Sequence, residues 1–404
     1  MKILLLSHIF PPAIDGGSRV IWKIGEYLQK EGHQVKALTT NCFSTDDFVT
    51  PTSIIIPKSP KTNSVNHIPM TRLPVYKRLR KPLKALKILF PKNSKVFNFL
   101  SLLQKGPIYK LLPLRKALLK IQDFKPDLII AGPLPTTIIL YAKLIKRICH
   151  CQLLISPCFH PKDPDFQNPL LFPLLNQADY LFTFTKFEKD QLQKHLVNKP
   201  KIFVSPLGVD PNFILDPKKV TYPKNPNILF IANFSAHKRT ELLIKAFQKL
   251  LLKHPHLTLT LLGQKTLYWP QIQKKLDKLP KNTCSKIKIF FSPSHSQIKK
   301  SIDSSTLLCL PSIHESFGLV LVESLARGKT VLTTDTPQTQ EVATLLSAHT
   351  FKTDNLNDLV NKLDTLLSTP SKLKSSAQKG QATVINSLTW DRIVHQLLIS
   401  INEK

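Results

Sequence analysis

The chain has 404 residues, with 57 Lys and Arg against 26 Asp and Glu and a formal net charge of +31 at pH 7. This length predicts two domains of ordinary size, and a hydrophobic content of 42% is that of a globular chain. No stretch of eighteen apolar residues occurs, and the apolar start Met1–Leu6 is too short for a signal peptide, so we expect a cytoplasmic protein. The six cysteines follow no disulfide or zinc spacing, and Cys149-His150-Cys151 is predicted to belong to a strand.

Strands and helices alternate through the first half of the chain. A continuous apolar strand is predicted over Lys2–Ser7, a helix over Val20–Lys30 and a strand over Val35–Thr39, which is typical of a parallel α/β sheet. Between the first strand and the helix, Gly16 and Gly17 would let backbone amides approach a phosphate, although a plain turn is the commoner use of such a pair. Four further strands are predicted at Asp127–Ala131, Leu153–Ser156, Tyr180–Phe184 and Lys201–Val204.

A Pro- and Lys-rich stretch then separates two predicted domains. Residues 1–207 form the first domain, 208–226 a linker and 227–385 the second domain, and 386–404 form a C-terminal helix that crosses back to the first. The second domain repeats the alternation, with a helix over Glu241–His254. Its strands are predicted at Asn227–Ala232, Leu257–Leu262, Ile287–Phe291, Thr306–Leu310 and Thr330–Thr334.

The most informative segment is P-S-I-H-E-S-F-G-L-V-L-V-E-S-L-A-R-G, which runs from Pro311 to Gly328. Glu315 lies in a predicted loop and Glu323 in the apolar helix after it; on one continuous helix they would be roughly 12 Å apart, too far to share a proton or a metal. The free N–H groups and the dipole at the helix start predict an anion site between the two carboxylates. A nucleotide sugar fits this arrangement, because it carries hydroxyl groups at both ends and a diphosphate in the middle. The alternative is that Glu315 caps the helix and Glu323 is solvated.

This segment resembles the donor-site signature of the family-4 (group 1) retaining glycosyltransferases, roughly P-S-x-x-E-x-F-G-x-x-x-x-E-A-x-A-x-G, with Ser324 where alanine is usual. The start M-K-I-L-L-L-S-H-I-F-P-P with its Gly-Gly pair, P-L-G-V-D at 206–210 and H-P-x-L-x-L-x-L-L-G at 254–263 resemble further signatures of the family. The resemblance implies the GT-B fold, an α/β architecture of two Rossmann-like doubly wound domains facing each other across a cleft. It is weakest from Cys42 to Lys120.

The resemblance also implies residue roles. Glu315 would bind the sugar hydroxyls of the donor, Glu323 the ribose hydroxyls of its nucleotide, and Lys238 would neutralise the leaving diphosphate. His160 would face the reactive sugar, with a structural or solvated histidine as the alternative. Glu315, Lys238 and His160 are thus the predicted catalytic residues, and neither a metal ion nor a cofactor is expected. The remaining donor-binding residues are predicted to be Gly16, Gly17, Asn233, Arg239, Gly263, Ser316, Phe317, Gly318 and Leu319, with Glu323.

The chain departs from the family pattern around the diphosphate. Asn233 stands where arginine is usual, and a lost charged donor would cost about 2–4 kcal/mol of transition-state stabilisation unless Arg239, which replaces a glycine, compensates. In addition, T-D-T-P-Q-T-Q-E over Thr334–Glu341 replaces a usual T-D-x-G-G-x-x-E, which predicts a stiffer and bulkier loop there.

Positive charge is concentrated where the resemblance is weakest. No Asp or Glu occurs between Asp47 and Asp123, and a short basic amphipathic helix is predicted to begin at Pro82 and to reach Phe90. We expect the basic region 72–120 to favour an anionic membrane surface, with a plainly solvated surface as an equal alternative. No nucleic-acid motif accompanies the charge, so nucleic acid is not an expected partner.

The combined hypothesis is a retaining hexosyltransferase. It would move a hexose from a UDP- or GDP-linked donor to a lipid-linked or polysaccharide acceptor in cell-envelope glycan synthesis, at the inner face of the membrane. The alternatives are a GT-B sugar-nucleotide epimerase and a degenerate nucleotide-sugar-binding protein without turnover.

Overall fold

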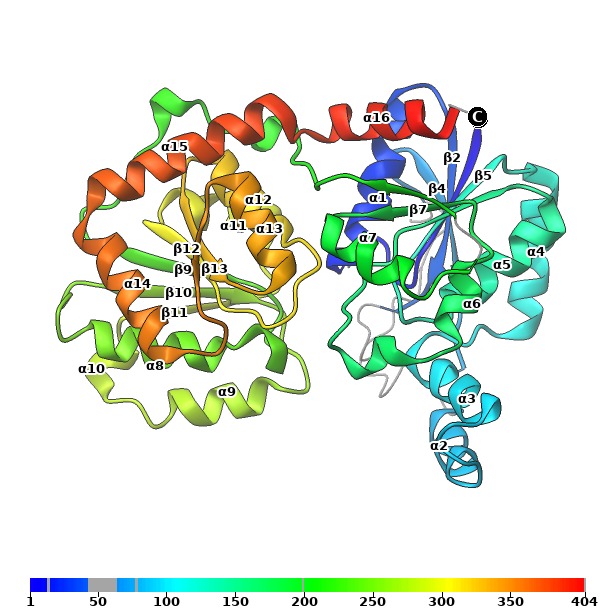
Figure 1. Cartoon of the computed structure of the whole chain (residues 1–404), viewed down its shortest axis with the longest axis horizontal. Coiled ribbons are helices and arrows are strands. Elements are labelled where there is room, and N and C mark those ends of the chain that lie inside the picture. Colours follow the sequence, from blue (N-terminus) through cyan, green and yellow to red (C-terminus); the bar gives the residue numbers. More distant parts are fainter. Residues whose placement is uncertain (13–14, 43–63, 77–78, 198–199, 403–404) are drawn as a thin grey trace. The chain divides into compact units, whose positions relative to one another are not determined.

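The structure is a computed structural model of the chain, and it describes residues 1–12, 15–42, 64–76, 79–197 and 200–402. The chain divides into two compact units, one formed by Met1–Ser205 with Val394–Lys404 and the other by Pro206–Ile393. Each unit is built on a sheet with helices on its faces (Figure 1). The C-terminal helix α16 (Trp390–Asn402) begins among residues of the second unit and ends among residues of the first.

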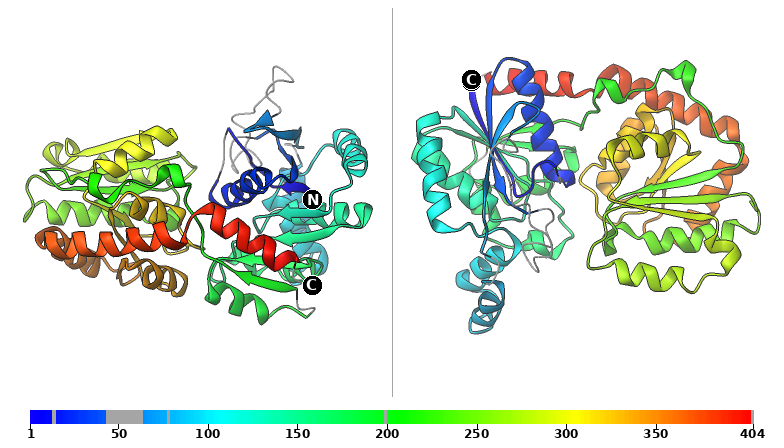
Figure 2. Two further views of the ribbon diagram at one scale, coloured as in Figure 1. Left: turned by 90° about the horizontal axis from the view of Figure 1, so that it is seen from above. Right: turned by 180° about the vertical axis from the view of Figure 1, so that it is seen from behind.

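The first unit contains an eight-stranded sheet in the order β3-β4-β2-β1-β5-β6-β7-β8, in which only β3 and β4 pair antiparallel. Helix α1 lies on one face, and α4 and α5 lie on the other (Figures 1 and 2). The strands are β1 (Lys2–Leu6), β2 (Gln34–Thr40), β3 (Ser64–Val65), β4 (Ile68–Leu73), β5 (Leu128–Ala131), β6 (Gln152–Ile155), β7 (Tyr180–Thr183) and β8 (Lys201–Val204). The helices are α1 (Gly16–Lys30), α2 (Arg80–Ile88), α3 (Lys95–Lys105), α4 (Leu111–Phe124), α5 (Ile138–Cys149), α6 (Leu171–Leu175) and α7 (Lys186–Gln193).

The second unit contains a parallel six-stranded sheet in the order β11-β10-β9-β12-β13-β14. Its strands are β9 (Asn227–Ile231), β10 (Thr258–Gly263), β11 (Ile287–Phe291), β12 (Leu307–Leu310), β13 (Thr330–Thr334) and β14 (His349–Phe351). Its helices are α8 (Thr240–Leu250), α9 (Trp269–Leu276), α10 (Lys281–Cys284), α11 (His295–Asp303), α12 (Leu319–Ala326), α13 (Pro337–Leu346), α14 (Leu356–Ser368) and α15 (Pro370–Ser387). The predicted α/β class with two Rossmann-like units is confirmed.

The strand order of the second unit reverses between β9 and β12. The chain steps outward from β9 to β10 and β11, and then returns to the other side of β9 to form β12, β13 and β14. In open α/β sheets, ligands bind outside the carboxyl ends of the two strands at such a reversal. The loops after β9 and β12 are therefore where the fold itself places a site.

Several local predictions need correction. Helix α1 begins at Gly16, not at Val20, because the Asp15 carboxylate caps it by accepting a hydrogen bond from the Ser18 N–H at 2.8 Å. The strand predicted for Cys149-His150-Cys151 is wrong, since Cys149 ends α5 and His150 turns the chain with φ of 52°.

Two further helix boundaries differ from the predictions. Helix α2 begins at Arg80, so Pro82 is its third residue, and it ends at Ile88, before Phe90. The stiff loop predicted over Thr334–Glu341 is instead the start of α13, where the Thr336 hydroxyl accepts the Thr339 N–H as an N-cap and Pro337 is the first helical residue.

The segment predicted as a linker, 208–226, belongs to the second unit. Its Phe213 is 1% exposed, and its Tyr222 hydroxyl donates to the Gly328 carbonyl at 2.9 Å. The fully buried Lys329 also reaches it: the ammonium donates to the Thr221 carbonyl and lies 4.6 Å from the centroid of the Tyr222 ring. The segment therefore has the composition of a linker but is packed against the second unit.

Lys329 predicts how stability depends on pH. Burial lowers the pKa of its ammonium to about 8, with a smaller lowering by Arg327 and an opposing effect of Asp303. Because the folded pKa lies below the unfolded value, the cost of burying the charge is fully present below pH 8 and is lost as the pH rises toward the unfolded pKa. We expect unfolding free energy to gain about 1–2 kcal/mol from this group between pH 8 and 10. Urea unfolding between pH 8 and 10 should show this gain in the native protein and not in Lys329→Met. An equal rise of unfolding free energy with pH in both proteins would contradict the prediction.

Candidate active site

Lys238 and Glu315 form an ion pair at the strand-order reversal of the second unit. Lys238 ends a short 3₁₀ helix, Ala236–Lys238, in the loop after β9, while Glu315 lies in the loop after β12. The two loops are also joined through their backbones, because the Ile313 N–H donates to the His237 carbonyl at 2.9 Å. Two predicted catalytic residues, far apart in sequence, are thus brought together by adjacent parallel strands.

The pair is mostly removed from water, with side-chain exposures of 16% for Lys238 and 10% for Glu315. Burial alone would raise the pKa of the Glu315 carboxyl, but the Lys238 ammonium and the nearby His237 hold that pKa below its usual value. Glu315 is therefore ionised at neutral pH. It can accept hydrogen bonds from hydroxyl groups, and Lys238 can donate to an anion.

Helix α12 starts beside this pair with its first N–H groups uncapped by any side chain. Its N-cap is Gly318, which has φ of 85° and ψ of 72°, a left-handed conformation that favours glycine. Glu315 precedes the cap by three residues, so the alternative in which Glu315 caps the helix is wrong. Uncapped N–H groups and the helix dipole together form a receptor for an anion, and Ser316, Phe317 and Leu319 border it in the chain.

Glu323 lies on α12 and is 5% exposed, so the alternative of a solvated outer face is also wrong. The helix is buried almost throughout, from Val320 to Ala326. A glutamate in such a helix is costly to bury unless it serves a partner or a ligand. Both carboxylates of the signature, Glu315 and Glu323, are thus buried.

Ser324 occupies a fully buried position next to Glu323, and its hydroxyl has no hydrogen-bond partner among the described residues. An unsatisfied buried hydroxyl costs about 1–3 kcal/mol. We therefore expect Ser324→Ala to raise the unfolding free energy of the second unit by about 1 kcal/mol. Ser305→Ala is the matched control, because the equally buried Ser305 hydroxyl donates to the Ile302 carbonyl at 2.8 Å and its loss should destabilise. Urea unfolding measures the free energy of both variants. A loss of unfolding free energy in both would contradict the prediction.

The loop after β9 carries two of the departures from the family pattern, Asn233 and Arg239. Asn233 is exposed, and its carbonyl accepts the Ser235 N–H at 2.8 Å. Arg239 adopts a left-handed conformation with φ of 51°, and its guanidinium donates to Asp354 at 2.9 Å. Asp354 engages one nitrogen of the Arg239 guanidinium, and compensation for Asn233 stays a prediction.

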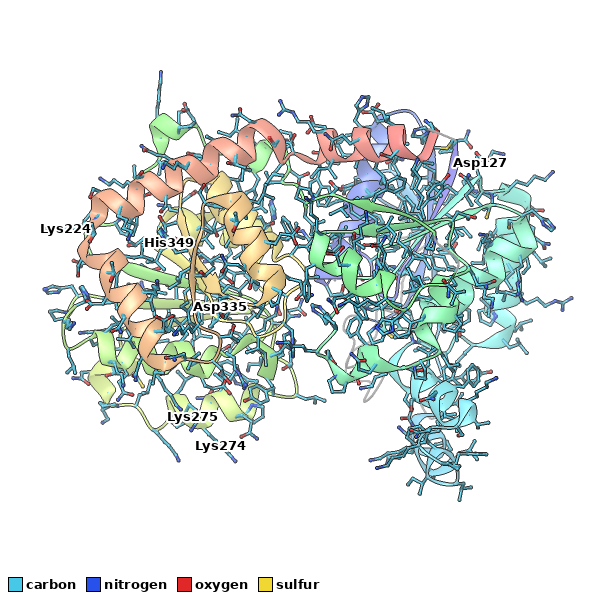
Figure 3. All side chains as sticks on the ribbon, viewed as in Figure 1. Asp127, Lys224, Lys274, Lys275, Asp335 and His349 are labelled. Carbon is cyan, nitrogen blue, oxygen red and sulfur yellow. The ribbon has the colours of Figure 1, made fainter. Side chains whose placement is uncertain are left out.

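The partner of Arg239 comes from the loop after β14, which sequence reasoning missed. Asp335, labelled in Figure 3, accepts hydrogen bonds from both the N–H and the hydroxyl of Thr353, at 2.8 and 2.7 Å. This anchors the loop that carries Asp354. No local signal in the sequence connects Arg239 with a residue 115 positions later.

Gly263 ends β10, and its place is decided by packing. A Cβ atom there would lie 1.8 Å from the Ala232 carbonyl oxygen at the end of β9. The absence of a side chain lets the two strand ends approach each other. A role for Gly263 in donor binding is not needed to explain the glycine.

In the first unit, Gly16 and Gly17 form the start of α1. A Cβ atom on Gly17 would lie 2.7 Å from the Pro133 ring, whereas one on Gly16 would meet nothing within 4 Å. The capping Asp15 is itself bound by His8, 2.5 Å from its carboxylate to the imidazole Nε2, and His8 is 2% exposed. Sequence reasoning missed this partly buried pair, although a histidine after the first strand and an aspartate seven residues later were visible.

His160 lies after β6 and is partly buried, with its ring edge-on to Phe166 at 5.2 Å between centroids. Its predicted role toward a donor sugar stays a prediction, as do those of Gly16 and Gly17. In the described ranges, no three His, Cys, Asp or Glu side chains gather as metal ligands would. The helices described include none with the length and apolar character that crossing a membrane requires.

Comparison with known proteins identifies the second unit. Residues 213–383 match the family model described as "Glycosyl transferases group 1". This part of the chain belongs to the group 1 glycosyltransferases. Lys238, Glu315 and Glu323 all lie inside the matched range, so the family predicted from the P-S-x-x-E-x-F-G segment is confirmed.

A curated relative and two solved structures are also similar to this chain. An uncharacterised glycosyltransferase of Haemophilus influenzae is 24% identical over 206 residues, which are 50% of this chain and 56% of that protein, little more than half its length. The structure of Anabaena HepE in complex with UDP and glucose has a TM-score of 0.73 at 16% identity, with both chains covered completely. Sucrose-phosphate synthase from Thermosynechococcus elongatus has a TM-score of 0.70 at 16% identity, covering 100% of this chain and 98% of its own. These likenesses show the GT-B fold.

Proposed function

We propose that this protein transfers a sugar from a nucleotide-sugar donor to an acceptor hydroxyl. The observation that carries the proposal is the Lys238–Glu315 pair at the strand-order reversal, beside the uncapped start of α12. A cation and helix N–H groups suit a diphosphate, and an ionised carboxylate suits sugar hydroxyls. HepE, whose fold this chain shares, is described as bound to UDP and glucose, which supports a UDP-linked hexose as the donor.

The chemistry follows from where charge develops. As the bond between the anomeric carbon and the diphosphate oxygen breaks, negative charge grows on that oxygen and positive charge on the sugar ring. Lys238 and the N–H groups of α12 would stabilise the leaving diphosphate, while Glu315 would orient the sugar. If the acceptor hydroxyl attacks on the face from which the diphosphate leaves, its proton passes to the departing oxygen and the anomeric configuration is retained.

The cationic groups of the site also bear on metal requirement. Lys238 and the dipole of α12 supply positive charge where a divalent cation would otherwise neutralise the diphosphate. We propose that transfer needs neither a metal nor a cofactor. Transfer rates should be unchanged in EDTA and after re-addition of Mg²⁺ or Mn²⁺; a rate restored only by the metal would overturn this part of the proposal.

The proposed acceptor is a lipid-linked or polysaccharide glycan of the cell envelope, used at the inner face of the membrane. The observation that supports it is the net charge of +31, because such a charge attracts anionic surfaces. The basic residues Lys77 and Arg78 of the predicted membrane region lie outside the described residues.

A nucleotide screen followed by a turnover assay tests the proposed function. UDP or GDP at a hundred times its dissociation constant should stabilise the protein by about 2.7 kcal/mol, and ADP serves as the comparison. A nucleotide sugar that gives a thermal shift should then be hydrolysed slowly or transferred. Conversion of the donor sugar without any acceptor would favour an epimerase, and binding without turnover under all acceptors would favour a degenerate binding protein.

A further inference from the structure

Helices α2 and α3 pack side by side and project from the rest of the first unit (Figures 1 and 2). We refer to residues 79–105 as the α2–α3 hairpin. Nineteen large hydrophobic side chains are exposed in the described part of the chain, and six of them fall in this short segment. They are Leu79, Leu86, Ile88, Leu89, Val96 and Phe99, with Ile88 and Leu89 at 76% and 75% exposure.

The same hairpin carries only positive charge. Lysines at 81, 84, 87, 92, 95 and 105 accompany the apolar side chains, and no Asp or Glu occurs between Asp47 and Asp123. Singly exposed hydrophobic residues are ordinary on protein surfaces, but a projecting cluster of them is typical of an interaction site. A cluster with lysines around it and no acidic side chain within it is complementary to a surface that is both apolar and anionic.

The hairpin is held in place by polar contacts. Lys87 of α2 donates to the Gln104 side chain of α3 at 3.0 Å, so the two helices are tied together. Lys105 pairs with Asp165 at 2.7 Å, and the Asn168 side chain donates to the Asn98 carbonyl at 2.8 Å, which tie α3 to the first unit. The apolar side chains at the turn, Ile88 and Leu89, belong to this anchored element, and no helix or strand in the described part of the chain covers them.

We propose that the α2–α3 hairpin docks on an anionic lipid bilayer, with Ile88 and Leu89 inserted among the acyl chains and the lysines at the headgroups. Aliphatic side chains gain free energy on entering the acyl boundary, and lysines gain from the negative surface potential. Lysine stems also cover apolar surface while their ammonium groups stay at the interface. Only the purpose of this docking rests on the proposed function: it would bring the enzyme to a lipid-linked acceptor.

Charge argues against two other occupants of this surface. A second copy of the chain would bring another +31 and its own lysines against these lysines, so like charges would meet. Nucleic acid would satisfy the lysines but not Ile88 and Leu89, because single strands are held by aromatic stacking and duplexes through phosphates. A bilayer satisfies both kinds of side chain at once.

Vesicle flotation of the full chain, without donor, tests the docking. The protein should bind phosphatidylglycerol vesicles and not phosphatidylcholine vesicles. Ile88→Asp with Leu89→Asp should lower the partition coefficient at least tenfold. Leu252→Asp with Leu267→Asp is the matched control, because these residues are 89% and 70% exposed on the second unit. It should leave binding within twofold of the native protein.

A second pair of variants tests whether binding depends on the lysines of the hairpin or only on the net charge of the protein. Lys81→Glu with Lys84→Glu should weaken binding more than Lys274→Glu with Lys275→Glu, which removes the same charge from α9, where both lysines point into solvent (Figure 3). Two binding results would overturn the proposal. One is an equal loss of vesicle binding in the two lysine variants, and the other is equal vesicle binding by the two hydrophobic variants. A change from dimer to monomer confined to the Ile88 and Leu89 variant would overturn it as well, because it would identify a second copy as the occupant.

The two proposals fail independently. Ile88 and Leu89 are not assigned to the donor site, so the thermal shift given by a nucleotide should be the same in that variant as in the native protein. Vesicle binding by a protein that binds no nucleotide would overturn the proposed function alone. A nucleotide-binding protein that ignores anionic vesicles would overturn the docking alone.

Discussion

Lys238→Ala is expected to lower the rate of sugar transfer by about 10²–10³-fold, which corresponds to about 3–4 kcal/mol of transition-state stabilisation. The ammonium lies at the strand-order reversal, where a leaving diphosphate would gather charge. Because that charge appears mainly in the transition state, the loss should fall on kcat more than on KM. Steady-state transfer kinetics with the donor identified by the nucleotide screen measure the effect.

Arg239→Ala is the informative comparison for Lys238→Ala. If the guanidinium stays with Asp354, its removal should change transfer less than tenfold, whereas a loss as large as that of Lys238→Ala would show that Arg239 replaces the missing arginine at Asn233. Glu315→Gln keeps the shape of the partner side chain and removes its charge. Transfer unaffected by both Lys238→Ala and Glu315→Gln would contradict the proposed function itself.

Gly263→Ala is expected to destabilise the second unit strongly, although it adds only one methyl group. Its Cβ atom would lie 1.8 Å from the Ala232 carbonyl oxygen, and a backbone oxygen cannot move aside as a side chain can. Overpacking of this kind costs about 3 kcal/mol, so the melting temperature should fall by roughly 6–12 °C. Thermal unfolding by circular dichroism measures the change.

Gly16→Ala supplies the control for Gly263→Ala. A Cβ atom on Gly16 meets nothing within 4 Å, and alanine is favoured over glycine within a helix, so the melting temperature should stay or rise slightly. A melting temperature of Gly263→Ala as high as that of Gly16→Ala would show that Ala232 and Gly263 are less closely packed than the structure describes.

The sequence alone was sufficient for most strands of the two sheets and for the family. Continuous apolar runs such as Ile3–Leu6 and Leu307–Leu310 have one stable use in a parallel sheet, burial on both faces, and all are found as strands. The start of α12 was predictable because Gly318 and the apolar residues after it are local signals. Short-range signals misled where one residue served another purpose: Asp15 caps α1 across the Gly-Gly pair, and the linker composition of 208–226 covers a packed segment.

The tertiary structure alone decided which distant side chains meet. Glu315 and Glu323 were visible as a spacing, but their burial, and the contact of Glu315 with Lys238 from a loop 77 positions earlier, depend on β9 and β12 being neighbours in the sheet. The same holds for Arg239, whose guanidinium meets Asp354 from the loop after β14, 115 positions later in the chain. Local patterns specify elements because the backbone repeats every few residues. Side-chain partners depend on strand order, which those patterns do not encode.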